Sequence, residues 1–132
     1  QTQKDIENLT KIELRKKKTD YSKQYKIVES LFKKTARPVI FLSHNVPYNT
    51  PLDQINNPQS PRNGEHFGSV IARQMIDKYY PLVCIGGHMH EHFGDYKLGQ
   101  TRVINAGFGS NVNTLLELEG NKIKRLEFYK QE

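Results

Sequence analysis

The sequence predicts a mixed α/β fold in which one βαβ unit precedes a C-terminal hairpin of strands. Residues 39–42 and 82–85 are short apolar runs rich in β-forming side chains, which is typical of buried strands, and we expect the first to be buried on both faces. Between them, residues 65–79 carry apolar side chains at helical spacing. Strand, helix and strand in this order indicate two parallel strands joined by a right-handed crossover.

The length and composition leave room for one modest domain. The chain has 132 residues, of which 36% are hydrophobic and 26% charged. No run approaches the roughly 18 apolar residues of a membrane span, so no membrane partner is expected. The single cysteine, Cys84, excludes an internal disulfide framework and predicts a reducing compartment such as the cytoplasm.

The charge balance is basic, with 20 Lys and Arg against 14 Asp and Glu. A net charge of +6 raises the local concentration of anions, including phosphate esters and nucleic acid. Much of the excess falls within residues 11–34, where the simplest interpretation is the solvated face of a helix.

Before the first strand the chain favours helix. Residues 1–20 are polar and predict a marginal helix or a disordered lead-in, whereas residues 22–34 predict a better one. We expect its apolar stripe to pack in the core; the stripe consists of Tyr21, Tyr25, Val28 and Phe32. A break near residue 36 ends this pattern, and we interpret it as a connection within one domain.

The segment after the first strand predicts a long loop and then a helix. Residues 45–64 hold four prolines and several asparagines without periodicity, and loops of this length are often functional. Asn63 is the expected N-cap of the helix at 65–79, which Pro81 ends.

The C-terminal part predicts short strands. A loop through Gly99 leads to a strand at residues 102–104. Residues 114–118 and 122–129 then predict a hairpin around Gly120-Asn121. Its alternation is imperfect, because Ile123 and Leu126 fall on opposite faces of a regular strand.

Histidines gather where the two buried strands end. His44 directly follows the first strand, and His88 and His90 follow the second after Gly86-Gly87. The carboxyl ends of parallel strands share one edge of a sheet, where open α/β folds bind ligands. The two glycines permit a sharp turn and a close approach of the backbone. Neutral imidazole is a common metal ligand, so His44, His88 and His90 predict a metal site.

The other two histidines carry a weaker signal. A polar surface residue is the simpler interpretation of both. As functional residues, His92 would line the pocket, and His66 would face an anion at the start of the second helix.

Several motifs recur in the order found in one family. They are Ser43-His44-Asn45-Val46-Pro47, His66-Phe67-Gly68-Ser69, Gly87-His88-Met89-His90-Glu91 and Asn105-Ala106-Gly107. Over about residues 22–128 the chain resembles the C-terminal half of calcineurin-like metallophosphoesterases, particularly the small prokaryotic ones. Tyr48 and Ala106 depart from this pattern, since proline is frequent at both positions.

The resemblance implies half of an αββα sandwich and a site with two divalent ions, which would be Mn, Fe, Zn or Ni. His44 and His88 would ligate one ion and His90 the other. The pair would activate a hydroxide that hydrolyses phosphomonoesters or phosphodiesters, nucleotides and nucleic acid among them. Asn45, His66, His92 and Asn105 would lie around the pocket. Asn105 would mainly hold the turn beneath it, together with Gly107.

Three motifs of the family do not occur: Asp-x-His, the bridging Gly-Asp and Gly-Asn-His. The resemblance therefore implies that the bridging carboxylate, the asparagine ligand and the acid-base histidine of the family lie outside this chain. Gly94-Asp95 lies after the histidines and does not replace the bridging aspartate. Residues 1–132 are therefore expected to form a single partial domain, the C-terminal portion of such an enzyme. Alone it would hold at most one ion and be weakly active or inactive. The exposed half-sandwich would associate with its missing N-terminal half or with itself.

Three alternatives stay open at this point. A histidine-triad nucleotide hydrolase would use residues 88–92, although Glu91 interrupts the apolar spacing of that family. A cupin-like site also contains His-x-His but requires an all-β fold. A non-catalytic module that binds phosphate or nucleic acid would contain the histidine cluster by chance, and its affinity would depend on salt rather than on chelator.

Overall fold

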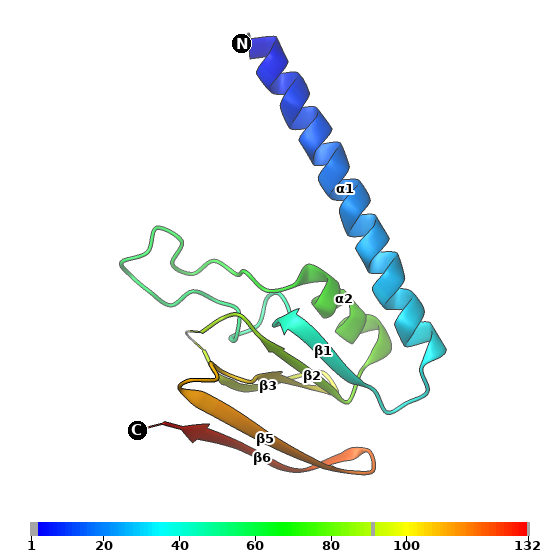
Figure 1. The fold of residues 1–132 in the computed structure, drawn as a ribbon, viewed down its shortest axis with the longest axis vertical. Coiled ribbons are helices and arrows are strands. Elements are labelled where there is room, and N and C mark those ends of the chain that lie inside the picture. Colours follow the sequence, from blue (N-terminus) through cyan, green and yellow to red (C-terminus); the bar gives the residue numbers. More distant parts are fainter. Residues whose placement is uncertain (1–2, 91, 132) are drawn as a thin grey trace. The chain divides into compact units, whose positions relative to one another are not determined.

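The structure is a computed structural model that describes residues 3–90 and 92–131, with side chains from residue 10 onward (Figure 1). The chain divides into two compact units, Gln1–Thr35 and Ala36–Glu132, and each is described by itself. The division falls where the helical pattern of the sequence breaks. Within the described residues, neither helix combines the length and apolar character needed to cross a bilayer.

The first unit is one continuous helix, α1 (Gln3–Lys34). The two segments expected here therefore join across residue 21, and residues 1 and 2 lie outside the described part. Neither glycine nor proline occurs between residues 3 and 34, and the many Lys, Glu, Arg and Leu residues favour helix. The expected apolar stripe is buried at Phe32 but 40% exposed at Tyr21.

The second unit contains a four-stranded mixed sheet with the order β1-β2-β4-β3. Its parallel strands are β1 (Ile40–Asn45), β2 (Val83–Gly87) and β4 (Thr101–Asn105). The helix α2 (Val70–Tyr79) connects β1 to β2. This arrangement confirms the predicted βαβ unit and the mixed α/β fold.

A strand that the sequence did not predict completes the sheet. β3 (Gly94–Leu98) pairs antiparallel with β4 inside the segment expected to be a loop. Its middle residues, Asp95, Tyr96 and Lys97, carry polar groups and are exposed, because the strand lies at the edge of the sheet. An exposed edge strand needs no apolar run, so its sequence carries little signal.

The expectation that the first strand is buried on both faces is wrong. Ile40 is 47% exposed and Leu42 is 72% exposed, whereas Phe41 packs against the core. β1 is the other edge of the sheet, and only one of its faces meets core residues. By contrast, Val83 and Cys84 of β2 are completely buried.

The start of α2 also corrects the expectation. The N-cap is Ser69 rather than Asn63, and its Oγ accepts a hydrogen bond from the backbone N–H of Ala72 at 3.1 Å. Residues 66–69 precede the helix in a non-helical conformation and lie beside the segment that follows β1. Gly68 permits this approach, because a Cβ there would lie 2.5 Å from the carbonyl oxygen of Pro47.

The core lies between α2, the sheet and the long loop after β1. Its members come from all three and from the loop after β2, and they are Val46, Leu52, Ile76, Cys84, Met89 and Val103. Burial raises the pKa of the Cys84 thiol to about 12, so this thiol stays protonated and unreactive.

The hairpin consists of β5 (Val112–Glu119) and β6 (Lys122–Lys130), which confirms the predicted pair. The register pairs Leu118 with Ile123 but Glu117 with Arg125, so β6 contains one extra residue there. This β-bulge turns Ile123 and Leu126 toward the same face, which explains the imperfect alternation of the sequence.

Candidate metal centre

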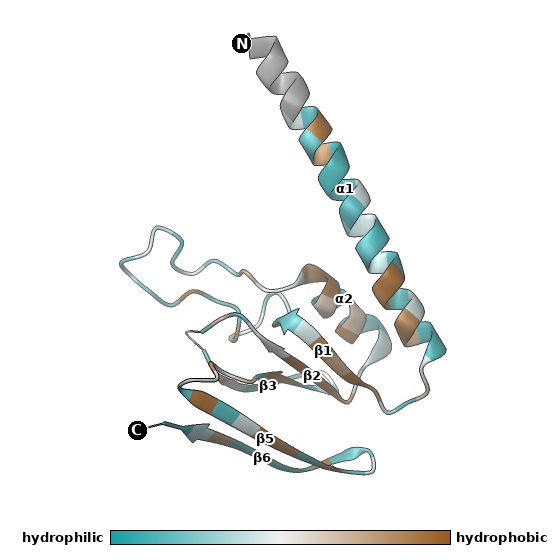
Figure 2. Cartoon of the chain, viewed as in Figure 1, coloured by the Kyte–Doolittle hydropathy of each residue, from teal (hydrophilic) through white to brown (hydrophobic). Residues whose placement is uncertain are grey.

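Three parallel strands end at one edge of the sheet, and polar side chains follow there. Asn45 at the end of β1 pairs with Gly87 of β2, and Gly86 pairs with Asn105 of β4. In Figure 2 the body of β1 is apolar and its arrowhead is hydrophilic, which marks this carboxyl edge. Parallel strands bring these ends together although they are far apart in the sequence.

The imidazoles of His44 and His88 are neighbours at this edge. Their ring centroids lie 5.1 Å apart, with an angle of 53° between the ring planes. Both residues are exposed. His88 has a φ of 70°, a left-handed conformation that residues with side chains adopt at an energetic cost.

Three glycines lie near this edge, and they differ in whether a side chain would fit in their place. A Cβ on Gly86 would lie 2.9 Å from the backbone carbonyl of Asn45, so the ends of β1 and β2 approach too closely for any side chain. Gly87 has open space, since its nearest neighbour would be 3.9 Å away. Gly107 adopts a φ of 91°, and a Cβ there would meet Val112 at 2.8 Å.

Asn105 is a buried structural residue. Its side-chain amide donates to the carbonyl oxygen of Met89 at 2.8 Å and to that of His92. Its Oδ1 accepts from the backbone N–H of Gly107 at 3.1 Å. Asn105 therefore ties the histidine loop to the turn after β4.

The other two histidines of this loop have different surroundings. The exposed ring of His90 lies against Phe108, with centroids 4.4 Å apart. His92 is half-buried, and its Nε2 lies 2.6 Å from the carbonyl oxygen of Gln54, so it fastens two loops together. No group of three His, Cys, Asp or Glu side chains that could hold a metal ion occurs in the part of the chain that the structure describes. The structure thus brings together His44 and His88, while His90 contacts an aromatic ring.

Asn45 links the edge to the long loop. Its Nδ2 donates to the carbonyl oxygen of Phe67 at 2.7 Å. Its Oδ1 is buried and makes no hydrogen bond to any described residue. A buried side-chain carbonyl oxygen without a hydrogen-bond donor is rare in folded proteins.

An aspartate–histidine pair, Asp53 and His66, lies between β1 and α2. The sequence pointed to His66 but not to Asp53. His66 Nδ1 contacts Asp53 Oδ1 at 2.6 Å, and Asp53 is completely buried. As a functional residue, His66 would face an anion at a helix start; in the structure it precedes α2 and contacts this carboxylate. The partners are 13 residues apart in an aperiodic segment, so no local pattern identifies Asp53.

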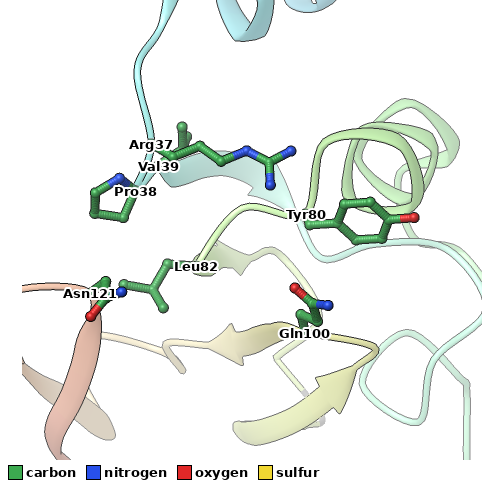
Figure 3. Close-up of a pocket in the computed structure, with 7 residues that line it drawn as sticks. All are labelled: Arg37, Pro38, Val39, Tyr80, Leu82, Gln100 and Asn121. Atoms are coloured by element: carbon green, nitrogen blue, oxygen red, sulfur yellow. The ribbon is translucent and has the colours of Figure 1, made fainter.

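A separate pocket of about 340 Å³ lies at the opposite edge, near the amino ends of the parallel strands (Figure 3). Its lining comes from the segments before β1, β2 and β4 and from the hairpin turn: Arg37, Pro38, Val39, Tyr80, Leu82, Gln100 and Asn121. None of the five histidines lines this pocket, so it is distinct from the histidine edge.

The fold matches part of larger proteins of known structure. One crystal structure aligns with 83% of this chain at a TM-score of 0.58 and 18% identity. The crystal structure of TT1561 of Thermus thermophilus aligns with 78% at a TM-score of 0.50 and 24% identity. This likeness shows the fold, and the chain spans 39% of the length of each. No protein-family model and no curated protein matches the sequence.

Proposed function

We propose that this chain supplies the histidine part of a metal-dependent phosphoester hydrolase that acts on phosphomonoesters or phosphodiesters. The observation that carries the proposal is the pair of exposed imidazoles, His44 and His88, at the carboxyl ends of adjacent parallel strands. The family resemblance of the surrounding motifs and the partial match to larger structures support it.

The spacing of the two rings fits a shared ion. An ion about 2.1 Å from one nitrogen of each ring, at a tetrahedral angle, places the ring centroids about 5 Å apart. The observed separation is 5.1 Å.

A bound divalent ion would supply a Lewis acid and a nucleophile at neutral pH. The chain's own residues would position it: His44 and His88 as ligands, and Asn105 by holding the loop that carries His88. His90 would serve a second ion, after its ring leaves Phe108. Imidazole accepts several first-row ions, so Mn, Fe, Zn and Ni all fit. We place the activity in a reducing compartment, the cytoplasm, because Cys84 is a free buried thiol.

The remaining ligands would come from a second polypeptide segment, either an N-terminal half or another copy of the chain. β1 leaves one sheet edge open, with Leu42 72% exposed and Ile40 47% exposed. Covering such an apolar edge is favourable. We expect the isolated chain to self-associate and Leu42→Lys to weaken the association at least several-fold, measured by analytical ultracentrifugation. Exposed Leu31→Lys on α1 is the control, and equal association of all three proteins would contradict this role of β1.

The hydrolysis of p-nitrophenyl phosphate and bis(p-nitrophenyl) phosphate tests the function. In the active assembly containing this chain, we expect activity with Mn²⁺, loss on chelation and recovery on adding the metal. His88→Ala should reduce kcat at least about 100-fold, because a ligand is lost. Activity that is indifferent to both chelator and His88→Ala would refute the proposal.

A further inference from the structure

A second pocket adjoins the pocket of Figure 3 near the amino ends of the parallel strands. It has a volume of about 320 Å³, and the two pockets share Leu82 and Gln100 in their walls. Backbone hydrogen bonds fix this shared wall, since Leu82 donates to Val39 at 2.9 Å and accepts from Arg102 at 3.1 Å. Volumes above about 300 Å³ are typical of small-molecule sites. The two pockets therefore form one groove with room for a ligand of two parts.

The second pocket, which we call the Lys97 pocket, is basic. Three cations line it, and they are Lys97, Arg102 and Lys122. No carboxylate of the described residues lines either pocket. Neither lysine makes an ion pair within the part of the chain that the structure describes. Glu119 is opposite Lys122 in the hairpin, but its carboxylate lies 3.9 Å from Lys124. The Lys97 pocket is thus suited to an anion with more than one negative charge.

The placement of Lys97 and Arg102 costs the fold stability. The two residues are directly opposite each other in the antiparallel pairing of β3 with β4. Like charges at such positions repel each other and destabilise a sheet. Asp95 pairs with Arg102 at 2.8 Å but forms no ion pair with Lys97. Sequences depart from the local rules of stability mainly where a ligand needs the residue, so this pair indicates a bound anion.

Tyr80 supplies a flat aromatic surface in the pocket of Figure 3, which we call the Tyr80 pocket. It is the C-cap of α2 and has a φ of 49°, a left-handed conformation in which glycine is the usual residue. Its side chain is largely open to solvent, and the guanidinium carbon of Arg37 lies 6.0 Å from its ring centroid (Figure 3). Aromatic rings and guanidinium planes are the groups on which nucleobases stack. The amides of Gln100 and Asn121 in the same pocket can donate to and accept from a base edge.

We propose that this groove binds a nucleotide with two or more phosphates, the base in the Tyr80 pocket and the phosphates in the Lys97 pocket. A free nucleotide fits better than a nucleic acid strand, because the three cations line one pocket instead of following a track. An acidic peptide would leave the aromatic surface of Tyr80 unused. The site does not depend on the proposed hydrolase function, since no histidine lines either pocket.

Calorimetric titration of the whole chain with ADP tests the site. EDTA is present throughout, so that no metal ion at the histidine edge contributes. We expect one ADP to bind per chain, and we expect pyrophosphate and adenosine each to bind at least about tenfold more weakly, because each occupies only one pocket. The absence of binding at millimolar ADP would overturn the proposal. Tighter binding of an oligothymidylate strand or of polyglutamate than of ADP would overturn it as well.

Two substitutions separate binding from a structural role. Lys97→Gln should weaken ADP binding about tenfold, the effect of one charge-assisted hydrogen bond, without lowering the melting temperature, because it removes the repulsion of Arg102. Tyr80→Asn should weaken it at least about fivefold through lost stacking, and asparagine tolerates the left-handed conformation.

The matched control is Lys18→Gln, which removes the same charge from an exposed position on α1. We expect ADP affinity within about twofold of the wild type, because charges beyond about 10 Å are screened by salt. Equal weakening by Lys97→Gln and Lys18→Gln would show that net charge attracts ADP, and would overturn the groove as its site.

Amide spectra of the ¹⁵N-labelled chain locate the ligand. ADP in EDTA should shift the resonances of Tyr80, Gln100 and Arg102 and leave those of His44 and His88 in place. Shifts confined to His44 and His88 would overturn the groove and leave the proposed function intact. Loss of phosphoester hydrolysis on its own would remove the proposed function and leave this site intact.

Discussion

Asp53→Asn is expected to lower the free energy of unfolding at pH 7 by about 3–5 kcal/mol, the range for disrupting a buried charged network. The carboxylate is completely buried and accepts three backbone N–H groups together with the imidazole of His66. An asparagine has one acceptor oxygen and an NH₂ group, so at least one backbone donor would be left unpaired. Urea denaturation of the whole chain, followed by circular dichroism, measures the change.

The matched control is Asp77→Asn. Asp77 is 56% exposed at its side chain and pairs with Arg73 at 3.1 Å on the surface of α2. Such pairs contribute at most about 1 kcal/mol. If the two substitutions lowered the free energy of unfolding equally, the hydrogen bonds of Asp53 would not be what stabilises the long loop.

The same network predicts how stability depends on pH. Burial raises the pKa of Asp53, but the hydrogen bonds from His66, Thr50, Gly68 and Asn49 lower it by more. The net pKa of the carboxyl therefore lies below its ordinary value of 3.8. In the unfolded chain the carboxyl binds a proton more readily. Its stabilising contribution is therefore fully present above about pH 4 and is lost as the pH falls through the folded pKa. Asp53→Asn should flatten this acid limb of the stability profile.

Gly86→Ala is expected to lower the free energy of unfolding by about 1–3 kcal/mol, the range for an overpacked site. The new Cβ would lie 2.9 Å from the backbone of Asn45 and Val46, so the ends of β1 and β2 would have to separate. Because these ends carry His44 and His88, the substitution should also weaken binding of a divalent ion. Thermal unfolding and Zn²⁺ titration calorimetry measure the two effects.

Gly87→Ala is the control for this substitution. Its nearest neighbour would be 3.9 Å away, in ordinary contact, so we expect a change within about 0.5 kcal/mol and metal binding like that of the wild type. Should Gly86→Ala prove as harmless as Gly87→Ala, the close approach of the two strands would not be what positions the histidines.

The elements with strong hydrophobic patterns could be predicted from the sequence. β2 and α2 bury apolar residues at the spacing of their secondary structure, and the hairpin turn at residues 120–121 has a recognisable composition. β3 could not be predicted, because its middle residues are exposed and need no apolar pattern. The start of α2 was misplaced because Asn63 and Ser69 are both good N-cap residues, and the tertiary contacts of residues 66–69 select the second.

Part of the site could also be predicted, since topology places the ends of parallel strands together. This accounts for the proximity of His44 and His88, which lie 44 residues apart. The left-handed conformation of His88 and the contact of His90 with Phe108 depend on the fold of the loop, which no periodicity specifies. Asp53 was missed for the same reason, because its donors come from three separate positions of an aperiodic loop and from His66.

The most direct test of the central claim is a Zn²⁺ titration of the ¹⁵N-labelled chain, followed through the ring nitrogens of its histidines. We predict that His44 and His88 shift together and reach their end point at one equivalent of metal, whereas His90 does not move in that step, and that His90→Gln preserves the response. Resonances of His44 and His88 that stay unchanged, or that shift at different equivalents, would contradict a shared ion at the carboxyl edge of the sheet.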